Sequence, residues 1–535
     1  MKIAIAQINC IVGDIAGNAK KIIAYAQQAK AQGASLVLTP ELSLCGYPPE
    51  DLLLREDFFQ ACDDALVAMS QQLNGVTVIV GHPHVVGNQC FNAASVLQHR
   101  QVLATYHKHI LPNYGVFDEK RYFSAGREAL VFAHEGLNIG VLICADVWEA
   151  APAIASKNAG AQVLVALNAS PFHIDKQSTR YDKLRQRALD TQLPVIYANM
   201  VGGQDELVFD GASFVVNDKG VLTHELPAFA PSLALIAFEH TNVLKGELAP
   251  TLSLEASVYQ ALTLGLRDYV QKNGFPGVLL GLSGGIDSAL TLAIAVDAIG
   301  AEHVHAVMMP SEFTANMSVD DAREMANILG VQYSEIAIKS LYDAYVTALA
   351  PQFGDLPFDA TEENLQARIR GMLLMALSNK FGSIVVTTGN KSEMAVGYCT
   401  LYGDMAGGFA LLKDVPKTLV YRLSNYRNTL SQVIPSNIIT RAPSAELREN
   451  QLDQDSLPPY NLLDGIIEAY VEDDLSAQQI IAKGYTAHDV TRVLSMIDKS
   501  EYKRRQSPVG VRITHKGFGK DRRHPITVKA NYKLD

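Results

Sequence analysis

Short apolar runs separated by polar turns follow one another along the N-terminal half of the chain. Runs of this length, bounded by turn-forming residues, predict buried β-strands. We expect strands over residues 3–8, 35–38, 77–81, 93–97, 139–143, 162–167, 195–198, 209–220 and 233–238. Residues 18–32 instead carry apolar positions at helical spacing and stop at Gly33, which predicts a helix. These strands are too many for one βαβαβ half, so we predict two sheets with helices outside.

The pattern changes near residues 245–250, after which residues 254–272 predict one long helix. Further strands are expected over 277–282, 304–309 and 384–388, alternating with an alanine-rich helix that ends at 299 and a helix over 319–329. Strands that alternate with helices predict a doubly wound parallel sheet. We therefore expect an α/β protein with one domain over 1–245, a linker over 246–254 and a second domain over 255–535.

The composition agrees with folded domains and excludes a disordered chain. At 535 residues the chain is too long for one ordinary domain, and 48% of its residues are hydrophobic. The formal net charge of −11, from 45 basic and 56 acidic residues, argues against a general nucleic-acid or membrane-surface binder. Residues 501–535 differ, because they hold ten Lys or Arg and three acids. Two interpretations of this segment stay open: a solvated basic terminus and an anion-binding lid.

The cysteines and the apolar segments favour a cytoplasmic protein. None of the six cysteines forms a CxxC pair, and they lie at Cys10, Cys45, Cys62, Cys90, Cys144 and Cys399. Scattered thiols in a chain of this size are typical of a reducing compartment. The N-terminus lacks an apolar segment followed by a cleavage site, and no run of about eighteen apolar residues predicts a membrane span.

Three residues near predicted strand ends could form a nucleophilic site. Cys144 follows the strand at 139–143, and active sites of α/β sheets open at such ends. A lone cysteine there is more often a buried small residue, and a free thiol needs a base at neutral pH. Glu41 follows the strand at 35–38 and would accept the thiol proton. Lys108 would stabilise the oxyanion of a tetrahedral intermediate.

With their surrounding motifs, these residues resemble the Glu-Lys-Cys triad of the nitrilase (carbon–nitrogen hydrolase) superfamily over about residues 1–245. The resemblance implies an αββα sandwich and attack on an amide or nitrile carbon through a thioester. It also implies a supporting role for Glu119, in the motif FDEKRYF.

Further stretches resemble the glutaminase domains of NAD synthetases: LPNYGVFDEKRYF, NASPFH and NMVGGQDELVFDGAS. This resemblance implies that Tyr114, Ser170 and Lys176 hold a glutamine substrate. Ala145 departs from the pattern, because relatives often carry an acidic residue after the nucleophile. The contact to the α-amino group of glutamine would then come from elsewhere, such as a backbone carbonyl.

A glycine-rich hexapeptide, SGGIDS at 283–288, lies between a predicted strand and a predicted helix. Its glycines let the backbone approach an anion, the helix N-terminus supplies positive potential, and Asp287 could hold a Mg²⁺ that neutralises pyrophosphate. The string resembles the PP-loop of ATP pyrophosphatases and implies a Rossmann-like domain that cleaves ATP between its α and β phosphates. The implied ATP contacts are Gly281, Leu282, Ser283, Gly284, Gly285, Ile286, Asp287, Ser288 and Thr388.

The stretches 361–379, 387–418, 441–460 and 501–514 resemble NAD synthetases specifically. This resemblance implies that Asn364, Glu393 and Lys503 contact deamido-NAD, and Glu393 is also a candidate Mg²⁺ ligand beside Asp287. Further positive charge near the phosphates is expected from Arg368, Arg370, Lys391, Lys413 and Lys417.

The two halves together imply an amidation. Cys144 would release ammonia from glutamine, and the PP-loop domain would adenylate the nicotinate carboxylate of deamido-NAD for attack by that ammonia. The products would be NAD, AMP, pyrophosphate and glutamate, with a sheltered ammonia route and a homo-oligomer implied by the family. Two alternatives stay open: a nitrilase-type amidase fused to a nucleotide-binding regulatory module, and an amidotransferase with another carboxylate acceptor. The motifs at 361–418 argue against the latter.

Overall fold

The computed structural model describes residues 1–524, and the chain divides after Leu252 into two compact units. The part of the basic tail that holds Lys529 and Lys533 lies outside the described residues. Each unit is described by itself. No helix in the described part of the chain is long and apolar enough to cross a membrane.

The first sheet of the N-terminal unit has seven strands in the order β15-β14-β1-β2-β3-β4-β5. Strands β1, β2 and β3 run parallel, whereas β14, β4 and β5 pair antiparallel with their neighbours. The strands are β1 (Lys2–Gln7), β2 (Leu36–Leu38), β3 (Thr77–Val86), β4 (Gln89–Gln98), β5 (Gln101–His107), β14 (Ser232–Glu239) and β15 (Asn242–Val243).

The second sheet has six strands in the order β13-β12-β9-β8-β7-β6, with β7, β8 and β9 parallel. The strands are β6 (Leu130–His134), β7 (Leu137–Ile143), β8 (Val163–Asn168), β9 (Val195–Asn199), β12 (Phe214–Val216) and β13 (Leu222–Glu225). A separate antiparallel hairpin joins β10 (Val201–Gln204) to β11 (Leu207–Asp210).

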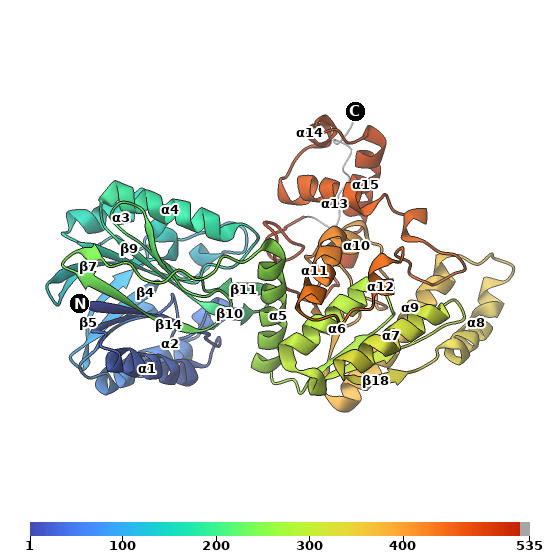
Figure 1. The fold of residues 1–535 in the computed structure, drawn as a ribbon, viewed down its shortest axis with the longest axis horizontal. Helices are drawn as coiled ribbons and strands as arrows, with labels where there is room; N and C mark the ends of the chain where they lie inside the picture. Colours follow the sequence, from blue (N-terminus) through green and yellow to red (C-terminus); the bar gives the residue numbers. More distant parts are fainter. Residues whose placement is uncertain (525–535) are drawn as a thin grey trace. The chain divides into compact units, whose positions relative to one another are not determined.

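Helices cover the outer faces of both sheets, as Figure 1 shows. One apolar core lies between the two sheets, and two others lie under the helices. The helices are α1 (Ile15–Ala31), α2 (Glu56–Gln72), α3 (Ala150–Asn158) and α4 (Lys176–Thr191), with short turns η1 (Glu50–Leu54), η2 (Glu119–Arg121) and η3 (Cys144–Val147). Helix α1 begins earlier than predicted because Asp14 caps it by accepting from the Gly17 N–H at 3.0 Å. The arrangement is the predicted αββα sandwich.

The strand predicted over 209–220 is wrong. Its residues belong to the end of β11 and to β12, which lie in different sheets. Between them Gly211 has φ +66° and Ala212 has φ +45°, and a strand cannot continue through two left-handed residues. The apolar composition on both sides conceals this break.

The C-terminal unit contains a five-stranded, fully parallel sheet in the order β18-β17-β16-β19-β20. The order reverses beside β16, so the carboxyl ends of β16 and its neighbours form the edge where ligands bind in such folds. The strands are β16 (Val278–Gly281), β17 (Val304–Met308), β18 (Gln332–Glu335), β19 (Ile384–Thr387) and β20 (Phe409–Ala410).

Helices cover both faces of this sheet, which confirms the predicted doubly wound fold. Helices α5, α6 and α11 pack together, α7 contacts α6, and α9 packs on β16 and β19. The helices are α5 (Leu254–Lys272), α6 (Ile286–Ile299), α7 (Asn316–Leu329), α8 (Lys339–Phe353), α9 (Ala360–Phe381), α10 (Lys391–Val396), α11 (Lys417–Leu430), α12 (Ser436–Thr440), α13 (Tyr460–Ile467), α14 (Ala477–Ala482), α15 (Ala487–Lys499) and α16 (Glu501–Arg504), with η4 (Ala301–His303), η5 (Asp453–Asp455) and the π-helical turn η6 (Glu468–Glu472).

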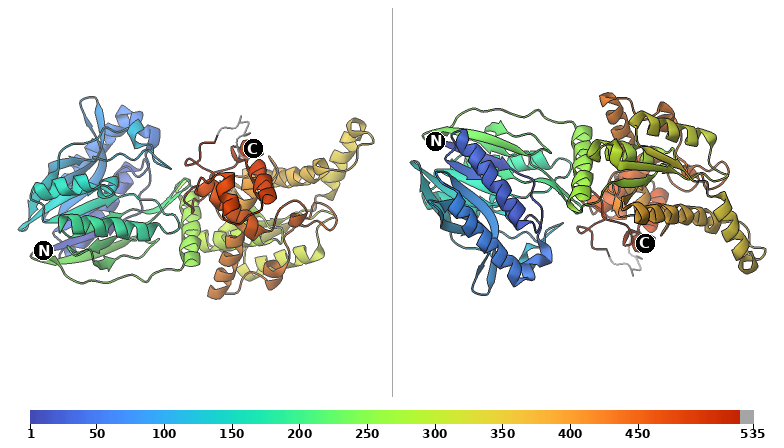
Figure 2. Two further views of the ribbon diagram at one scale, coloured as in Figure 1. Left: turned by 90° about the horizontal axis from the view of Figure 1, so that it is seen from above. Right: turned by 90° about the horizontal axis from the view of Figure 1, so that it is seen from below.

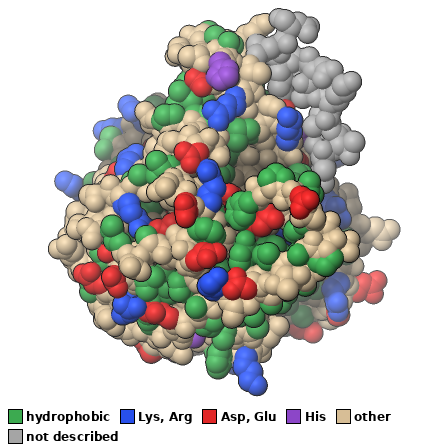
Figure 3. Space-filling model, turned by 90° about the vertical axis from the view of Figure 1, so that its right-hand side faces the viewer, with side chains coloured by type: hydrophobic (Ala, Val, Ile, Leu, Met, Phe, Trp, Pro, Cys, Tyr) green, Lys and Arg blue, Asp and Glu red, His purple; other side chains and the backbone are tan. Residues whose placement is uncertain are grey.

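The C-terminal unit also has a protruding helix, a separate helical cluster and a face of mixed charge. Helix α8 buries no residue and extends with the start of α9 away from the sheet (Figure 2). A separate helical cluster packs around Leu463, Ile466 and Val493. On the face in Figure 3, lysines and arginines are interspersed with acids, so the described residues seen from this side form no continuous basic surface.

Candidate active sites

Cys144 lies at the carboxyl end of β7, in the first position of η3, and is buried. Its φ of +42° is left-handed, an uncommon conformation that needs support from its surroundings. Asp146 supplies that support: its carboxylate accepts from the backbone N–H groups of His109 (3.0 Å) and Ile110 (2.8 Å) and from the Tyr106 hydroxyl (2.8 Å). The strand end that carries the thiol is thus fixed to the segment after β5.

A buried cluster of one lysine and two glutamates accompanies this thiol. Lys108 Nζ lies 2.6 Å from Glu41 Oε1 and 2.8 Å from Glu119 Oε1. Asn92 also donates to Glu41 at 2.8 Å, and the Tyr47 hydroxyl donates to Glu119 at 3.0 Å. A fully buried ammonium is retained only where such partners compensate its lost hydration.

The charges in the cluster set its protonation. Burial opposes the charge of Lys108, but the carboxylates of Glu119 and Glu41 outweigh it and raise the lysine pKa. Burial and the Glu41 carboxylate, which hydrogen-bonds the thiol, raise the pKa of Cys144 well above its usual value. The resting pair is therefore a thiol beside a carboxylate that can accept its proton, with a permanent cation next to both.

Glu119 carries a pH-dependent effect on stability that can be tested. Burial raises its pKa to about 7 from the usual 4.5, although Lys108 opposes the shift. The folded state binds this proton more tightly than the unfolded state does. Glu119 therefore stabilises the folded state fully below about pH 4.5, and this stabilisation is lost as the pH rises through 7.

Glutamine does not titrate, so Glu119→Gln should not lose this stability. The free energy of unfolding of the variant should therefore rise relative to that of the unmodified chain between about pH 4.5 and 7. Thermal melting of both proteins across this range measures the difference. A difference that stays constant with pH would show that Glu119 is ionised throughout.

The three predicted glutamine-binding residues differ in burial and in the groups that they contact. Tyr114 is 66% exposed, and Cys144 is near enough to raise its pKa, after the larger effect of partial burial. Ser170 is buried, and its hydroxyl accepts from Arg180 at 3.2 Å. Lys176 begins α4, with Nζ 4.2 Å from the centre of the Trp148 ring.

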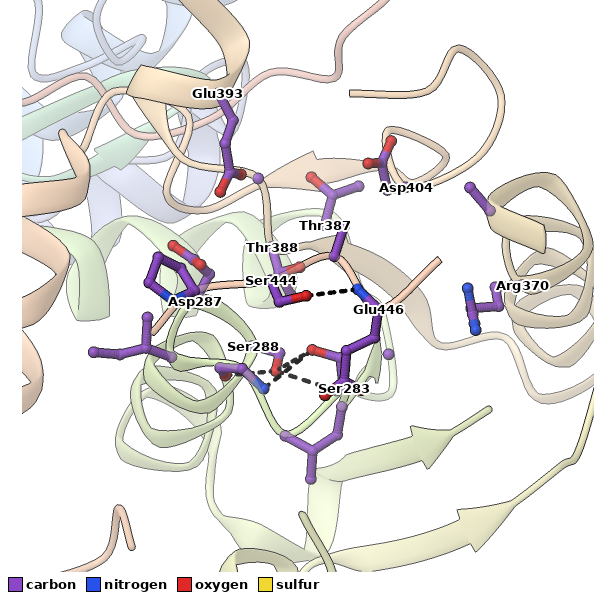
Figure 4. Close-up of a pocket in the computed structure, with 18 of the residues that line it drawn as sticks. Ser283, Asp287, Ser288, Arg370, Thr387, Thr388, Glu393, Asp404, Ser444 and Glu446 are labelled. Carbon is purple, nitrogen blue, oxygen red and sulfur yellow. Dashed lines mark hydrogen bonds between the residues drawn. The ribbon is translucent and has the colours of Figure 1, made fainter. Parts of the chain in front are cut away.

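The PP-loop residues line a cavity of ≈ 280 Å³ in the C-terminal unit (Figure 4). All of the predicted ATP contacts line it except Gly284. Gly284 has φ +78°, and a Cβ there would lie 2.4 Å from the Ser318 carbonyl oxygen, so only glycine fits between the loop and α7.

Internal hydrogen bonds shape the loop. The hydroxyls of Ser283 and Ser288 lie 3.1 Å apart, Ser283 Oγ accepts from the Gly285 N–H at 3.2 Å, and Ser288 donates to the Gly285 carbonyl at 2.9 Å. Helix α6 begins immediately after Gly285, which directs its N-terminus and positive end at the loop. The arrangement is suited to a phosphate group.

Two carboxylates meet one ammonium on the cavity wall. Lys417 Nζ lies 2.5 Å from Asp287 Oδ2 and 3.2 Å from Glu393 Oε1, and Asn390 donates to the other oxygen of Asp287 at 2.9 Å. Burial raises the pKa of Glu393 to about 8, although Lys417 opposes the shift. Among the described residues, no group of three or more His, Cys, Asp or Glu is arranged to hold a metal ion.

The remaining predicted contacts are divided between the cavity and the scaffold. Thr388 and Arg370 line the cavity, and burial lowers the pKa of Arg370 to about 10. Asn364 accepts from the Thr400 hydroxyl at 2.7 Å. Lys503 donates to the carbonyls of Gly397 and Cys399, so it holds the chain that follows α10.

Three of the five cations predicted near the phosphates lie outside the lining of the cavity. Lys391 is buried and paired with Asp414 (2.9 Å) and Glu472 (2.7 Å), which neutralise it within the scaffold. Lys413 lies outside the cavity lining and donates to the Pro508 carbonyl at 2.7 Å. Arg368, likewise outside the lining, donates to the Leu401 carbonyl.

The chain matches two known families along its length: carbon–nitrogen hydrolase over residues 2–241 and NAD synthase over residues 258–507. It is 49% identical over 531 residues to the glutamine-dependent NAD(+) synthetase of Acinetobacter baylyi, and the match covers 98% of each chain. The chain belongs to the glutamine-dependent NAD(+) synthetase family. The resemblance predicted from the sequence is confirmed.

Solved structures of the glutamine-dependent NAD(+) synthetase family agree. The enzyme of Acinetobacter baumannii, solved in complex with adenosine diphosphate, is 48% identical, has a TM-score of 0.81 and covers 98% of both chains. The protein of Cytophaga hutchinsonii, at 21% identity and a TM-score of 0.86 over 99% of this chain and 98% of its own, shares the fold.

Several residues that shape these sites were not predicted from the sequence of the chain. Asp146 and Arg180 are buried polar side chains whose partners lie far away in the sequence or on another strand. The burial of Lys417 between two carboxylates was likewise missed. The signal for Asp146 was its position two residues after Cys144, whereas nothing in the local sequence distinguishes Arg180 from the other charged residues of α4.

Proposed function

We propose that this chain synthesises NAD(+) from deamido-NAD, using ATP and the amide nitrogen of glutamine. It is a ligase that forms a carbon–nitrogen bond. One observation carries the proposal: a single chain holds a buried Cys-Glu-Lys cluster and a PP-loop cavity, and it matches glutamine-dependent NAD(+) synthetases over nearly its whole length.

In the N-terminal unit, Glu41 accepts the thiol proton while Cys144 Sγ attacks the amide carbon of glutamine. Lys108 is positioned to stabilise the negative oxygen of the tetrahedral intermediate. The C–N bond breaks, the nitrogen takes the proton and leaves as ammonia, and a thioester remains. Water then attacks the thioester carbon, which releases glutamate and restores the thiol. Tyr114, Ser170 and Lys176 hold the substrate.

In the C-terminal unit, the PP-loop holds ATP. A carboxylate oxygen of deamido-NAD attacks the α phosphorus, which breaks the bond to the bridging oxygen and releases pyrophosphate. Ammonia attacks the adenylated carbonyl, AMP leaves, and one proton is lost from the nitrogen. The proposed contacts to deamido-NAD are Asn364, Glu393 and Lys503, and the proposed contact to ATP outside the PP-loop is Thr388.

The carboxylates of Asp287 and Glu393 fit a magnesium ion in part. Magnesium binds through one or two carboxylates together with substrate phosphates, and these two already converge on one cation, Lys417. When bound, the ion would neutralise charge on the phosphates. The remaining ligands would come from ATP and water.

The remaining parts of the proposal concern organisation. The glutaminase is assigned to residues 1–245 and the synthetase to residues 255–535, joined by 246–254. Because ammonia becomes non-nucleophilic ammonium in water, a sheltered route between the sites is needed, and we propose a homo-oligomer that supplies part of it. A cytoplasmic location stays a prediction.

Removing magnesium tests the synthetase half. With glutamine, ATP and deamido-NAD present, excess chelator should abolish NAD(+) formation, and added Mg²⁺ should restore it with one AMP formed per NAD(+). Glutamate release in the absence of ATP should be unaffected, because the Cys144 cluster uses no metal in this scheme. Formation of ADP in place of AMP would exclude cleavage at the α phosphorus.

A further inference from the structure

Arg180 in α4 is completely buried in the N-terminal unit, beside the predicted glutamine-binding residue Ser170. A guanidinium has five N–H donors, and here the five have five acceptors. The acceptors are Ser170 Oγ (3.2 Å), the Ser170 carbonyl (2.8 Å), the Pro171 carbonyl (3.2 Å), Gln177 Oε1 (2.9 Å) and Asp210 Oδ2 (2.7 Å). Such a saturated guanidinium fixes the geometry of everything that it contacts.

The contacts of Arg180 hold both ends of one connection. Ser170 and Pro171 follow β8, whereas Gln177 lies in the first turn of α4, next to Lys176. One side chain therefore fixes the distance between the strand and the helix, which carry two of the three predicted contacts to glutamine, Ser170 and Lys176. The hydroxyl of Ser170 is also oriented, because its oxygen accepts from Arg180 and its hydrogen must point elsewhere.

The opposite side of this connection reaches the catalytic cluster. The N–H of Ala169 donates to Glu41 Oε2 at 3.0 Å, and the N–H of Ser170 donates to Asn199 Oδ1 at 2.9 Å. The backbone at 169–170 thus lies between the proposed base and the Arg180 guanidinium. Asp210 balances the charge of Arg180, so the pair adds rigidity without adding net charge beside the thiol.

We infer that Arg180 is a positioning residue of the glutaminase: it presets Ser170 and the start of α4 for glutamine and leaves ammonia-dependent synthesis untouched. This inference rests on the proposed function and deepens it. Lysine cannot replace the arginine, because an ammonium offers three donors from one atom and cannot reach Asp210 and the two ends of the connection together.

The test compares Arg180→Lys with Arg187→Lys in the full chain. Arg187 lies in the same helix, is also buried and is paired with Asp190 at 3.0 Å, which makes it a matched control. Arg180→Lys should raise the KM for glutamine roughly tenfold or more, with a smaller loss in kcat and an unchanged rate with ammonium salts. Arg187→Lys should leave the KM for glutamine, the kcat and the rate with ammonium salts within about twofold of those of the unmodified chain.

A spectroscopic readout separates binding from turnover. Trp148 is the only tryptophan of the chain, and Lys176 lies against its ring. Fluorescence titration with glutamine in a Cys144→Ala background should show a dissociation constant raised to the same degree by Arg180→Lys. If Arg180→Lys fails to fold, Gln177→Ala removes one acceptor without unpairing a charge and should raise the KM for glutamine by about threefold.

An unchanged KM and an unchanged dissociation constant in Arg180→Lys would overturn the inference. So would an unchanged KM in Gln177→Ala, because Arg180 would then be only structural. An unmodified chain that makes no NAD(+) from glutamine would instead count against the proposed function.

Discussion

Replacing Cys144 with alanine is expected to lower glutamine-dependent NAD(+) formation by roughly 10³-fold or more, while synthesis from ammonium salts continues at its normal rate. In the proposed mechanism the thiol forms the bond to glutamine, whereas Glu41 and Lys108 act as base and cation and are paired with each other at 2.6 Å. Ammonium supplies the same nitrogen without that bond, so the C-terminal site is unaffected. Initial rates with each nitrogen donor measure the difference.

Cys90→Ala is the matched control, since Cys90 is a partly buried thiol of the same unit and belongs to β4. It should leave both rates within about twofold of normal. Loss of both activities in Cys144→Ala would contradict two separate sites, and retention of both would show that the nucleophile lies elsewhere.

Asp287→Asn is expected to abolish NAD(+) formation with glutamine and with ammonium alike, by roughly 10²-fold or more. The substitution keeps the size of the side chain but removes the charge that faces Lys417 at 2.5 Å and that would hold the metal. Glutamate release should persist, because the N-terminal cluster does not use this residue. Assays of AMP, NAD(+) and glutamate on the same sample measure the activities of the C-terminal and N-terminal sites together.

Asp297 provides the comparison for this variant, because it lies near the other end of α6 and pairs with Arg427 at 2.7 Å. Asp297→Asn removes an equal charge from the same helix and should change only stability, by about 1 kcal/mol. A normal rate of NAD(+) synthesis in Asp287→Asn would refute the role proposed for that carboxylate.

The features that the sequence predicts well are local ones. Helix α5 begins and ends where predicted, at Leu254 and Lys272, because Ser253 caps it and apolar residues recur along its length. The PP-loop is recognisable because glycine is required at Gly284 and because strand, loop and helix are contiguous in the chain. The pairing of Glu41 with Lys108 is not local, and it was predicted from positions after strands together with the resemblance to the nitrilase triad.

The features that the sequence conceals depend on contacts between distant segments. Lys391 and Lys417 both belong to the stretch that resembles NAD synthetases, yet one is neutralised in the scaffold and the other lies in the cavity wall. Each of the two lysines pairs with one acid of the same stretch, so the local sequence does not separate them. They differ in the distant partner, Glu472 or Asp287, which lies 81 or 130 residues away. Arg180 was missed for the same reason, since its charge partner Asp210 lies 30 residues along the chain.

Transfer of the glutamine amide nitrogen tests the central claim most directly. The unmodified chain is supplied with amide-¹⁵N glutamine, ATP, Mg²⁺ and deamido-NAD, and the products are analysed by mass spectrometry. We expect ¹⁵N in the carboxamide of NAD(+), with AMP and glutamate formed in amounts at least equal to it. Glutamate and AMP without labelled NAD(+) would contradict the proposal that one chain couples the two reactions.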